Sequence, residues 1–227
     1  MTADTKQPNI QQFLIVMAKY PVLGRVKTRI AAEKGDMIAL EIYQELLRKT
    51  FEIAQHKSWK TYWFWDEVEN LSDELRTRST IQLPPFNRFN KQEFFHKLSY
   101  SIQTKGDLGK KLSSAMQEVY SLQKTLKKNK VILIGSDCPD ISTSLLENAF
   151  HALNSKDFVI GPSKDGGYYL IGMNHPFDEV FENIPWSTEI VFQETINRFF
   201  SLGKSFHILP TLSDIDHWED WNIYKSR

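Results

Sequence analysis

The segment 19–29 (KYPVLGRVKTR) places four cationic side chains around a glycine. Backbone amides of such a loop, together with lysine and arginine head groups, suit phosphate oxygens, and arginine can bind two oxygens at once. We interpret the segment as a phosphate-binding loop, although its composition fits a solvated surface loop equally well. It lacks the Gly-Lys-Ser/Thr spacing of a P-loop. The candidate ligands are Lys19, Gly24, Arg25, Lys27, Thr28 and Arg29.

An acidic group follows the apolar run at 131–135 (VILIG), in the order Ser136, Asp137, Cys138, Pro139 and Asp140. A buried strand would deliver these carboxylates at its carboxyl end. Magnesium and manganese prefer carboxylate oxygens, and magnesium often takes only one or two of them from the protein. Asp137 is therefore the first candidate metal ligand. Helix capping is the alternative role in this segment, and Asp140 or Ser142 fits that role better.

Two further segments carry candidate functional residues. Asp214 and Asp216 flank an isoleucine, and alternate residues of an extended segment face the same side, so both carboxylates could face one pocket. Capping of the final helix is the alternative for Asp216. In 161–169 (GPSKDGGYY), the glycines let the backbone approach a ligand, and Asp-Gly also favours a tight β-hairpin. The candidates there are Asp165, Gly166, Gly167 and Tyr168.

Other classes of chemistry lack their motifs. The six histidines show no metal-ligand spacing, and neither a Gly-x-Ser-x-Gly elbow nor a Gly-x-Gly-x-x-Gly loop is present, which argues against a serine hydrolase and a redox dinucleotide enzyme. The 28 basic residues equal the 28 acidic ones, so a general nucleic-acid binder is not expected.

The cellular setting follows from the cysteine count and the apolar runs. Cys138 is the single cysteine, which excludes an internal disulfide and favours a reducing cytoplasm. Residues 1–12 are polar, do not form a signal peptide and are expected to be flexible. The longest apolar runs are strand-sized, so no membrane span is expected.

The order of elements predicts a single α/β domain over residues 1–227. Apolar runs predict strands at 13–18, 59–65, 131–135, 157–162, 167–173 and 205–210, and apolar periodicity predicts helices at 36–56, 107–128, 188–200, 216–224 and after Ser142. Between residues 70 and 102 we expect a short helix at 70–78, a loop at 81–92 and a strand at 94–102. Alternating strands and helices form a three-layer α/β/α sandwich around a mostly parallel sheet, whose ligands bind at the carboxyl ends of the strands.

Five segments together resemble one family: MAKYPVLGRVKTRI, KGDLGKKLSSAM, GSDCPDIS, GPSKDGGYYLIGM and IPWSTEIVFQET, in this order. They are similar to the bacterial DUF2064 family, of the rSAM/selenodomain-associated transferase 1 type, over about residues 13–224. The resemblance implies the GT-A fold of nucleotide-diphospho-sugar transferases and a remoter similarity to guanylyltransferases. It also implies that 19–29 holds nucleotide phosphates, that Asp137 and Asp216 bind the metal, and that Asp165, Gly166 and Gly167 face the acceptor. Residues 78–95 are longer and more aromatic than the family pattern.

The sequence thus predicts a transferase that depends on Mg²⁺ or Mn²⁺ and acts on a nucleotide or nucleotide-sugar donor and a small-molecule acceptor. Asp137, Lys27 and Arg29 are the catalytic candidates, and Asp137 and Asp216 the metal ligands. Glycosyl transfer is the leading reaction, nucleotidyl transfer with release of pyrophosphate is the alternative, and a non-catalytic nucleotide-binding protein is a third possibility. The aromatic residues of 86–95 leave a homodimer contact and core packing both open.

Overall fold

The computed structural model describes residues 11–66, 99–122 and 129–227. In these residues the chain forms, in order, β1 (Gln12–Ala18), α1 (Thr28–Lys34), α2 (Asp36–Ala54), β2 (Lys60–Trp65), β3 (Ser99–Ile102), α5 (Leu108–Ser121), β4 (Lys130–Gly135), α6 (Thr143–Ala152), β5 (Phe158–Pro162), β6 (Tyr168–Met173), the 3₁₀ helix η1 (Asp178–Phe181), α7 (Val191–Ser201), β7 (Phe206–Ile208) and α8 (Trp218–Lys225).

The strands of this part of the chain form one seven-stranded sheet in the order β3-β2-β1-β4-β6-β5-β7. Strand β6 runs antiparallel to its neighbours β4 and β5. All other neighbouring pairs are parallel. The expected mostly parallel sheet is therefore confirmed, with one reversed strand that results from the β5–β6 hairpin.

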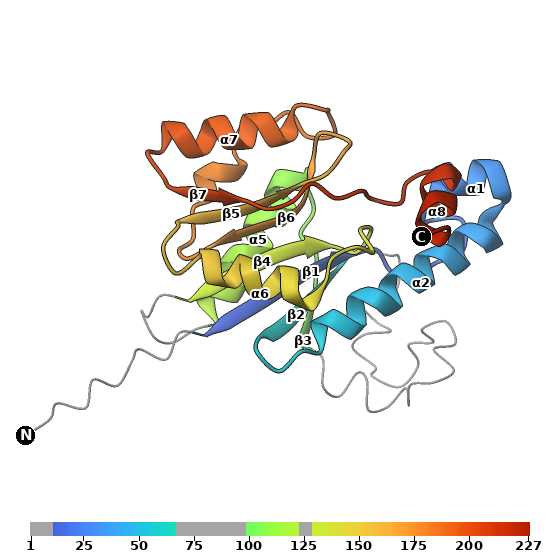
Figure 1. Cartoon of the computed structure of the whole chain (residues 1–227), viewed down its shortest axis with the longest axis horizontal. Helices are drawn as coiled ribbons and strands as arrows, with labels where there is room; N and C mark the ends of the chain where they lie inside the picture. Colours follow the sequence, from blue (N-terminus) through green and yellow to red (C-terminus); the bar gives the residue numbers. More distant parts are fainter. Residues whose placement is uncertain (1–10, 67–98, 123–128) are drawn as a thin grey trace, which may run out of the picture.

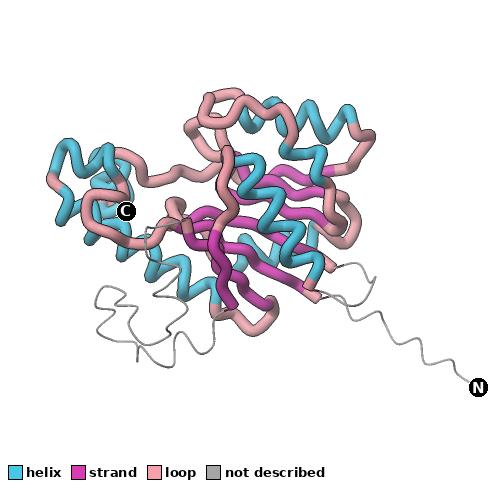
Figure 2. Tube along the Cα trace, turned by 180° about the vertical axis from the view of Figure 1, so that it is seen from behind, coloured by secondary structure: helices cyan, strands magenta, loops and turns pink. Residues whose placement is uncertain are grey.

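Helices cover both faces of the sheet, as the continuous apolar runs of the strands require. In β1, Leu14 and Val16 face the core on the side of α2 and α6, whereas Phe13 and Ile15 face the core on the side of α5 and α7. Figure 1 shows α2 and α6 in front of the strands, and Figure 2 shows helices over the opposite face. The three-layer arrangement predicted from the sequence is thus confirmed.

A third, smaller apolar cluster joins the N-terminal and C-terminal parts of the described chain beyond the end of the sheet. It contains Ile30 of α1, Ile42 and Leu46 of α2, and Ile215 and Trp221 at α8. Figure 1 shows α1, α8 and the start of α2 grouped together at this end. The packing fixes α8 and the segment before it next to the loop that follows β1.

One edge of the sheet collects the carboxyl ends of several strands. Strands β1, β2 and β4 are parallel and end there, and the backbone of Asp66 after β2 donates to the carbonyl of Ala18. The β5–β6 turn lies at the same edge, and the chain after β7 follows it through the bond from Leu212 N to Pro162 O. Ligands of open α/β sheets bind at this edge.

Some predicted elements differ from the structure. Helix α1 begins at Thr28, inside the segment 19–29, and continues to Lys34, where no helix was predicted. Helix α7 begins at Val191 rather than Thr188, because the hydroxyl of Thr188 bonds back to the carbonyl of Pro185 in the preceding turn. Several predictions lie wholly or partly outside the described residues: the end of the helix at 107–128, the start of the strand at 94–102, and the expectations for 70–78, 78–95, 81–92 and 86–95.

Within the described residues, no helix is long and apolar enough to cross a membrane.

The contact of β6 with its neighbouring strands gives a stability prediction. A Cβ at Gly172 would lie 2.7 Å from Cγ1 of Val159 and 2.8 Å from Cγ1 of Ile132. We expect Gly172→Ala to lower the free energy of unfolding by about 1–3 kcal/mol, because overpacking forces neighbouring side chains to shift. Urea unfolding measures the difference. Gly135→Ala is the matched control, since a Cβ there meets nothing within 4 Å, and an equal loss in both variants would contradict the prediction.

Candidate active site

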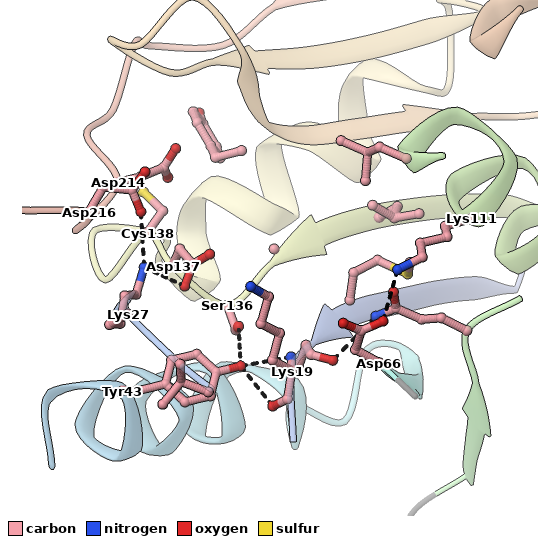
Figure 3. A pocket seen from close by; sticks show the side chains of 18 of the residues that line it. Lys19, Lys27, Tyr43, Asp66, Lys111, Ser136, Asp137, Cys138, Asp214 and Asp216 are labelled. Atoms are coloured by element: carbon pink, nitrogen blue, oxygen red, sulfur yellow. Dashed lines mark hydrogen bonds and ion pairs between the residues drawn. The ribbon is translucent and has the colours of Figure 1, made fainter. Parts of the chain in front are cut away.

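A cavity of about 560 Å³ opens at the carboxyl edge of the sheet (Figure 3). Its walls come from the ends of β1, β2 and β4, the start of α1, and the segment before α8. Charged side chains of both signs line it: Lys19, Lys27, Arg29, Lys111, Asp66, Asp137, Asp214 and Asp216. Opposite charges in one cavity suit a ligand that carries both phosphate groups and a metal ion.

Lys27 lies between two carboxylates that are far apart in the sequence. Its Nζ is 2.7 Å from Oδ1 of Asp137 and 3.2 Å from Oδ1 of Asp216. The Lys27 side chain is only 5% exposed. Burial alone would lower the pKa of Lys27, but Asp137 and Asp216 outweigh this effect and raise the pKa above its ordinary value. The group is therefore a permanent ammonium ion.

The segment before α8 is held against Asp137 by its own backbone. The amide of Ile215 donates to the carbonyl of Asp137 at 3.0 Å, and the Ile215 side chain is buried beside α1 and α2. The carboxylate of Asp220 accepts hydrogen bonds from the amides of Asp216 and His217. The carboxylate that caps the backbone amides at the start of α8 is therefore that of Asp220 and not that of Asp216. The capping alternative for Asp216 is wrong.

Arg29 provides a second cation for Asp216. Its Nη1 lies 3.0 Å from Oδ2 of Asp216, and its side chain is 64% exposed. Both oxygens of Asp216 therefore face cations, one on Lys27 and one on Arg29. An exposed ion pair of this kind contributes little to stability, so Arg29 is free to turn towards a bound anion.

Tyr43 of α2 connects the loop after β1 with the loop after β4. Its hydroxyl donates to the carbonyl of Lys19 and accepts from the amide of Lys19, both at 2.8 Å. The same oxygen lies 3.2 Å from Oγ of Ser136. Burial and the charge of Asp137 raise the pKa of Tyr43 far above its usual range, so the phenol remains a neutral hydrogen-bonding group. It fixes the position of Lys19 relative to Asp137.

The far end of the cavity contains residues that the sequence analysis missed. Nζ of Lys111 on α5 lies 2.8 Å from Oδ1 of Asp66, and the Gln103 amide donates to the carbonyls of Ala18 and Phe64. Asp66 directly follows β2, as Asp137 closely follows β4. The rule that selects Asp137 at the end of a strand would also have selected Asp66.

Asp214 lines the same cavity, two residues before Asp216. Burial raises the pKa of Asp214 to about 7, and the nearby carboxylates of Asp137, Asp165 and Asp216 act in the same direction. The positive charge of Lys27 lowers this pKa but does not outweigh them. The sequence placed Asp214 and Asp216 in one pocket but did not distinguish their environments. Both are half-buried, but Asp214 has the raised pKa, whereas Asp216 is paired with cations.

The β5–β6 turn has a defined internal structure. The carboxylate of Asp165 accepts from the amide of Gly167 at 2.9 Å and from the hydroxyl of Ser163. Gly166 has a φ of +86°, and a Cβ there would lie 2.0 Å from the carbonyl oxygen of Glu189. The hairpin predicted at Asp165 and Gly166 is confirmed. Asp165 lines a separate cavity of about 310 Å³ on the other side of Asp214 and Asp216, while Tyr168 lines the larger one.

The structure separates the residues predicted in segment 19–29 into two groups. Lys19, Lys27, Thr28 and Arg29 line the larger cavity. Gly24 and Arg25 lie outside that lining, where Gly24 has a φ of +76° and approaches Asp36. Cys138 is buried, and burial together with Asp214 raises the pKa of its thiol, so it is no nucleophile.

A family model described as uncharacterized protein conserved in bacteria (DUF2064) matches residues 73–188, slightly more than half of the 227 residues. The chain belongs to the DUF2064 family. The matched range includes Asp137 and the β5–β6 turn and excludes segment 19–29 and Asp216. No functionally curated protein matches the sequence.

Solved structures extend the likeness to nearly the whole DUF2064 chain. A protein of Desulfovibrio desulfuricans G20, provisionally assigned as a nucleotide-diphospho-sugar transferase, matches with a TM-score of 0.80 and 25% identity over 96% of this chain and 87% of its own. Two enzymes share the fold alone. One is 4-diphosphocytidyl-2C-methyl-D-erythritol synthase, with a TM-score of 0.58 and 9% identity over 97% of this chain and 99% of its own.

The second enzyme that shares the fold alone is CMP:2-keto-3-deoxy-manno-octonic acid synthetase, whose structure was solved in complex with CTP. It has a TM-score of 0.53 and 9% identity over 95% of this chain and 97% of its own. These likenesses confirm the GT-A-like fold that the resemblance implied. The likeness to the protein of Desulfovibrio desulfuricans G20 also supports the expectation that this DUF2064 protein is an enzyme of the transferase class.

The raised pKa of Asp214 predicts a pH-dependent change in stability. Its folded-state pKa of about 7 exceeds the unfolded value of about 3.9. The folded protein therefore loses stability as the pH rises between these two values, and the loss stays constant above them. We expect Asp214→Asn to melt at a higher temperature than the wild type at about pH 8 in metal-free buffer, with a smaller difference at about pH 5. Thermal melts at both pH values measure this, and an equal difference at both would contradict it.

Proposed function

We propose that this DUF2064 protein is a metal-dependent transferase that acts on a nucleotide-sugar, with glycosyl transfer as its leading reaction. The observation that carries the proposal is the meeting of Asp137, Asp216 and Lys27 at the carboxyl edge of the sheet. Three segments that lie at least 79 residues apart in the sequence supply these groups to one cavity, and a purely structural role does not require that.

The donor set of the cavity fits a magnesium or manganese ion. Asp137 and Asp216 have side chains that are 48% and 42% exposed, so their oxygens are accessible from the cavity. In the described part of the chain, no group of three or more His, Cys, Asp and Glu residues has metal-binding geometry. Two carboxylates are nevertheless sufficient for magnesium, whose remaining ligands are water and substrate phosphate. When bound, the ion would supply charge neutralisation at the phosphate oxygens.

The cationic side chains have complementary roles in this proposal. Lys27, Arg29 and Lys19 hold phosphate oxygens of the donor and stabilise the charge that develops on the leaving diphosphate. In glycosyl transfer the bond between the sugar carbon and the diphosphate oxygen breaks, and an acceptor oxygen bonds to that carbon. In nucleotidyl transfer the acceptor attacks the α-phosphorus, and pyrophosphate leaves. Both reactions use the same cations, and enzymes with this fold include one bound to CTP.

The acceptor side of the site is assigned to the β5–β6 turn. Asp165 lines the smaller cavity, and Gly166 and Gly167 follow it in the turn. Tyr168 begins β6 and lines the larger cavity. A small-molecule acceptor would reach the donor between these two cavities. A single, buried cysteine accords with a reducing cytoplasm as the place of action.

Replacement of Asp137 tests the proposed chemistry. We expect Asp137→Asn to lower turnover by about 10²–10³-fold while the protein stays folded, because a preorganised charge at the phosphates is lost. The assay incubates the enzyme, a panel of nucleotide-sugars and nucleoside triphosphates, and Mn²⁺, and measures released nucleoside diphosphate and pyrophosphate separately. Nucleoside diphosphate identifies glycosyl transfer, and pyrophosphate identifies nucleotidyl transfer.

Asp178→Asn is the matched control for this experiment. The carboxylate of Asp178 accepts hydrogen bonds from Ser113 and Gln117 and lines neither of the two cavities described above. The control should keep turnover within about threefold of the wild type, as expected for a substitution away from the site. Near-normal turnover of Asp137→Asn would overturn the assignment of the metal ligand.

A further inference from the structure

Lys27 engages the carboxylate oxygens that a shared metal ion would need. Its Nζ contacts Oδ1 of Asp137 at 2.7 Å and Oδ1 of Asp216 at 3.2 Å. The second oxygen of Asp216 contacts Arg29 at 3.0 Å. The point from which both aspartates can be reached is therefore already taken by an ammonium ion (Figure 3). A divalent cation at that point would compete with the Lys27 ammonium for Oδ1 of Asp137 and Oδ1 of Asp216.

The backbone holds Lys27 in this position. Lys27 precedes α1 and has a φ of 47° and a ψ of 48°, in the left-handed region. A non-glycine residue there is strained and persists only where the surroundings enforce it. Its side chain is 5% exposed, whereas that of Arg29 is 64% exposed. Arg29 can leave Asp216 at little cost, whereas the buried ammonium ion of Lys27 needs another anion before it can leave both carboxylates.

We propose that Lys27 is an internal counter-ion that keeps the metal position closed until the donor arrives, so that metal and donor phosphates enter together. The phosphates would provide a new partner for the ammonium, and the freed carboxylate oxygens would then accept the divalent ion. The charge of the site remains balanced throughout, because the incoming anion and the incoming cation compensate each other. This inference rests on the proposed function for the identity of the anion, but its central claim concerns metal binding alone.

The test measures binding of Mn²⁺ without any nucleotide. Free Mn²⁺ is followed by its electron paramagnetic resonance signal during titration of the wild type, Lys27→Met and Lys19→Met. We expect Lys27→Met to bind Mn²⁺ about tenfold more tightly than the wild type or better, because a positive charge within contact distance of both ligands is removed. Lys19→Met removes the same charge from the same cavity, and Lys19 has no ion pair with Asp137 or Asp216 among the described contacts. Its affinity should change less than about threefold.

Further variants separate the proposed cause from a general effect of charge. In the double variant Lys27→Met/Asp216→Asn, the gain should disappear, since one of the two metal ligands is lost. Lys27→Arg keeps a cation in place and should not gain affinity. If Lys27→Met does not fold, Lys27→Gln replaces it, because an amide can still donate to one carboxylate.

Equal Mn²⁺ affinity of the wild type and the folded Lys27→Met variant, or Lys27→Gln where it replaces Lys27→Met, would overturn the inference, and so would an equal gain in Lys19→Met. Neither outcome depends on turnover. Failure of the proposed function would instead appear as no released nucleoside diphosphate or pyrophosphate from the wild type with any donor of the panel. The two failures are therefore distinguishable.

Discussion

The ammonium ion of Lys27, held between Asp137 and Asp216, is the interaction on which the arrangement of this site depends. Two carboxylates brought close together repel each other, and a buried lysine alone would lose its charge. Together the three groups are compatible, because each carboxylate stabilises the ammonium ion and the ammonium ion offsets the repulsion. Asp214 lies nearby and has no ion pair with a cation among those described. Its pKa is raised to about 7, which favours the neutral form of its carboxyl group.

The fold provides the contacts that keep this group together. Strand β4 delivers Asp137 to the carboxyl edge of the sheet, and the amide of Ile215 binds the carbonyl of that same aspartate. The side chain of Ile215 is anchored in the apolar cluster of α1, α2 and α8. Helix α1 begins directly after Lys27 and belongs to that cluster through Ile30. A single small core beyond the sheet therefore positions both ends of the ionic contact, which links the packing of the C-terminal helix to the chemistry of the cavity.

The sequence predicted the layers and much of the site because both follow from local patterns. Continuous apolar runs identified the buried strands, and the carboxyl-edge rule directed attention to Asp137 and to segment 19–29. The rest depends on tertiary contacts. No local signal shows that Lys27 turns inward while Arg25 does not, since this results from the left-handed backbone at Lys27. Lys111 and Gln103 were missed because α5 and the chain after β3 join the cavity from distant parts of the sequence. Asp66 was missed although it follows a strand, as Asp137 does.

A crystal structure with Mn²⁺ and the donor found in the activity panel would test the central claim most directly, because the anomalous signal of manganese locates the ion without ambiguity. The account predicts manganese between Asp137 and Asp216, with Nζ of Lys27 moved from these carboxylates to a phosphate oxygen of the donor. Manganese bound elsewhere, or Lys27 still bridging both aspartates beside the bound donor, would contradict it.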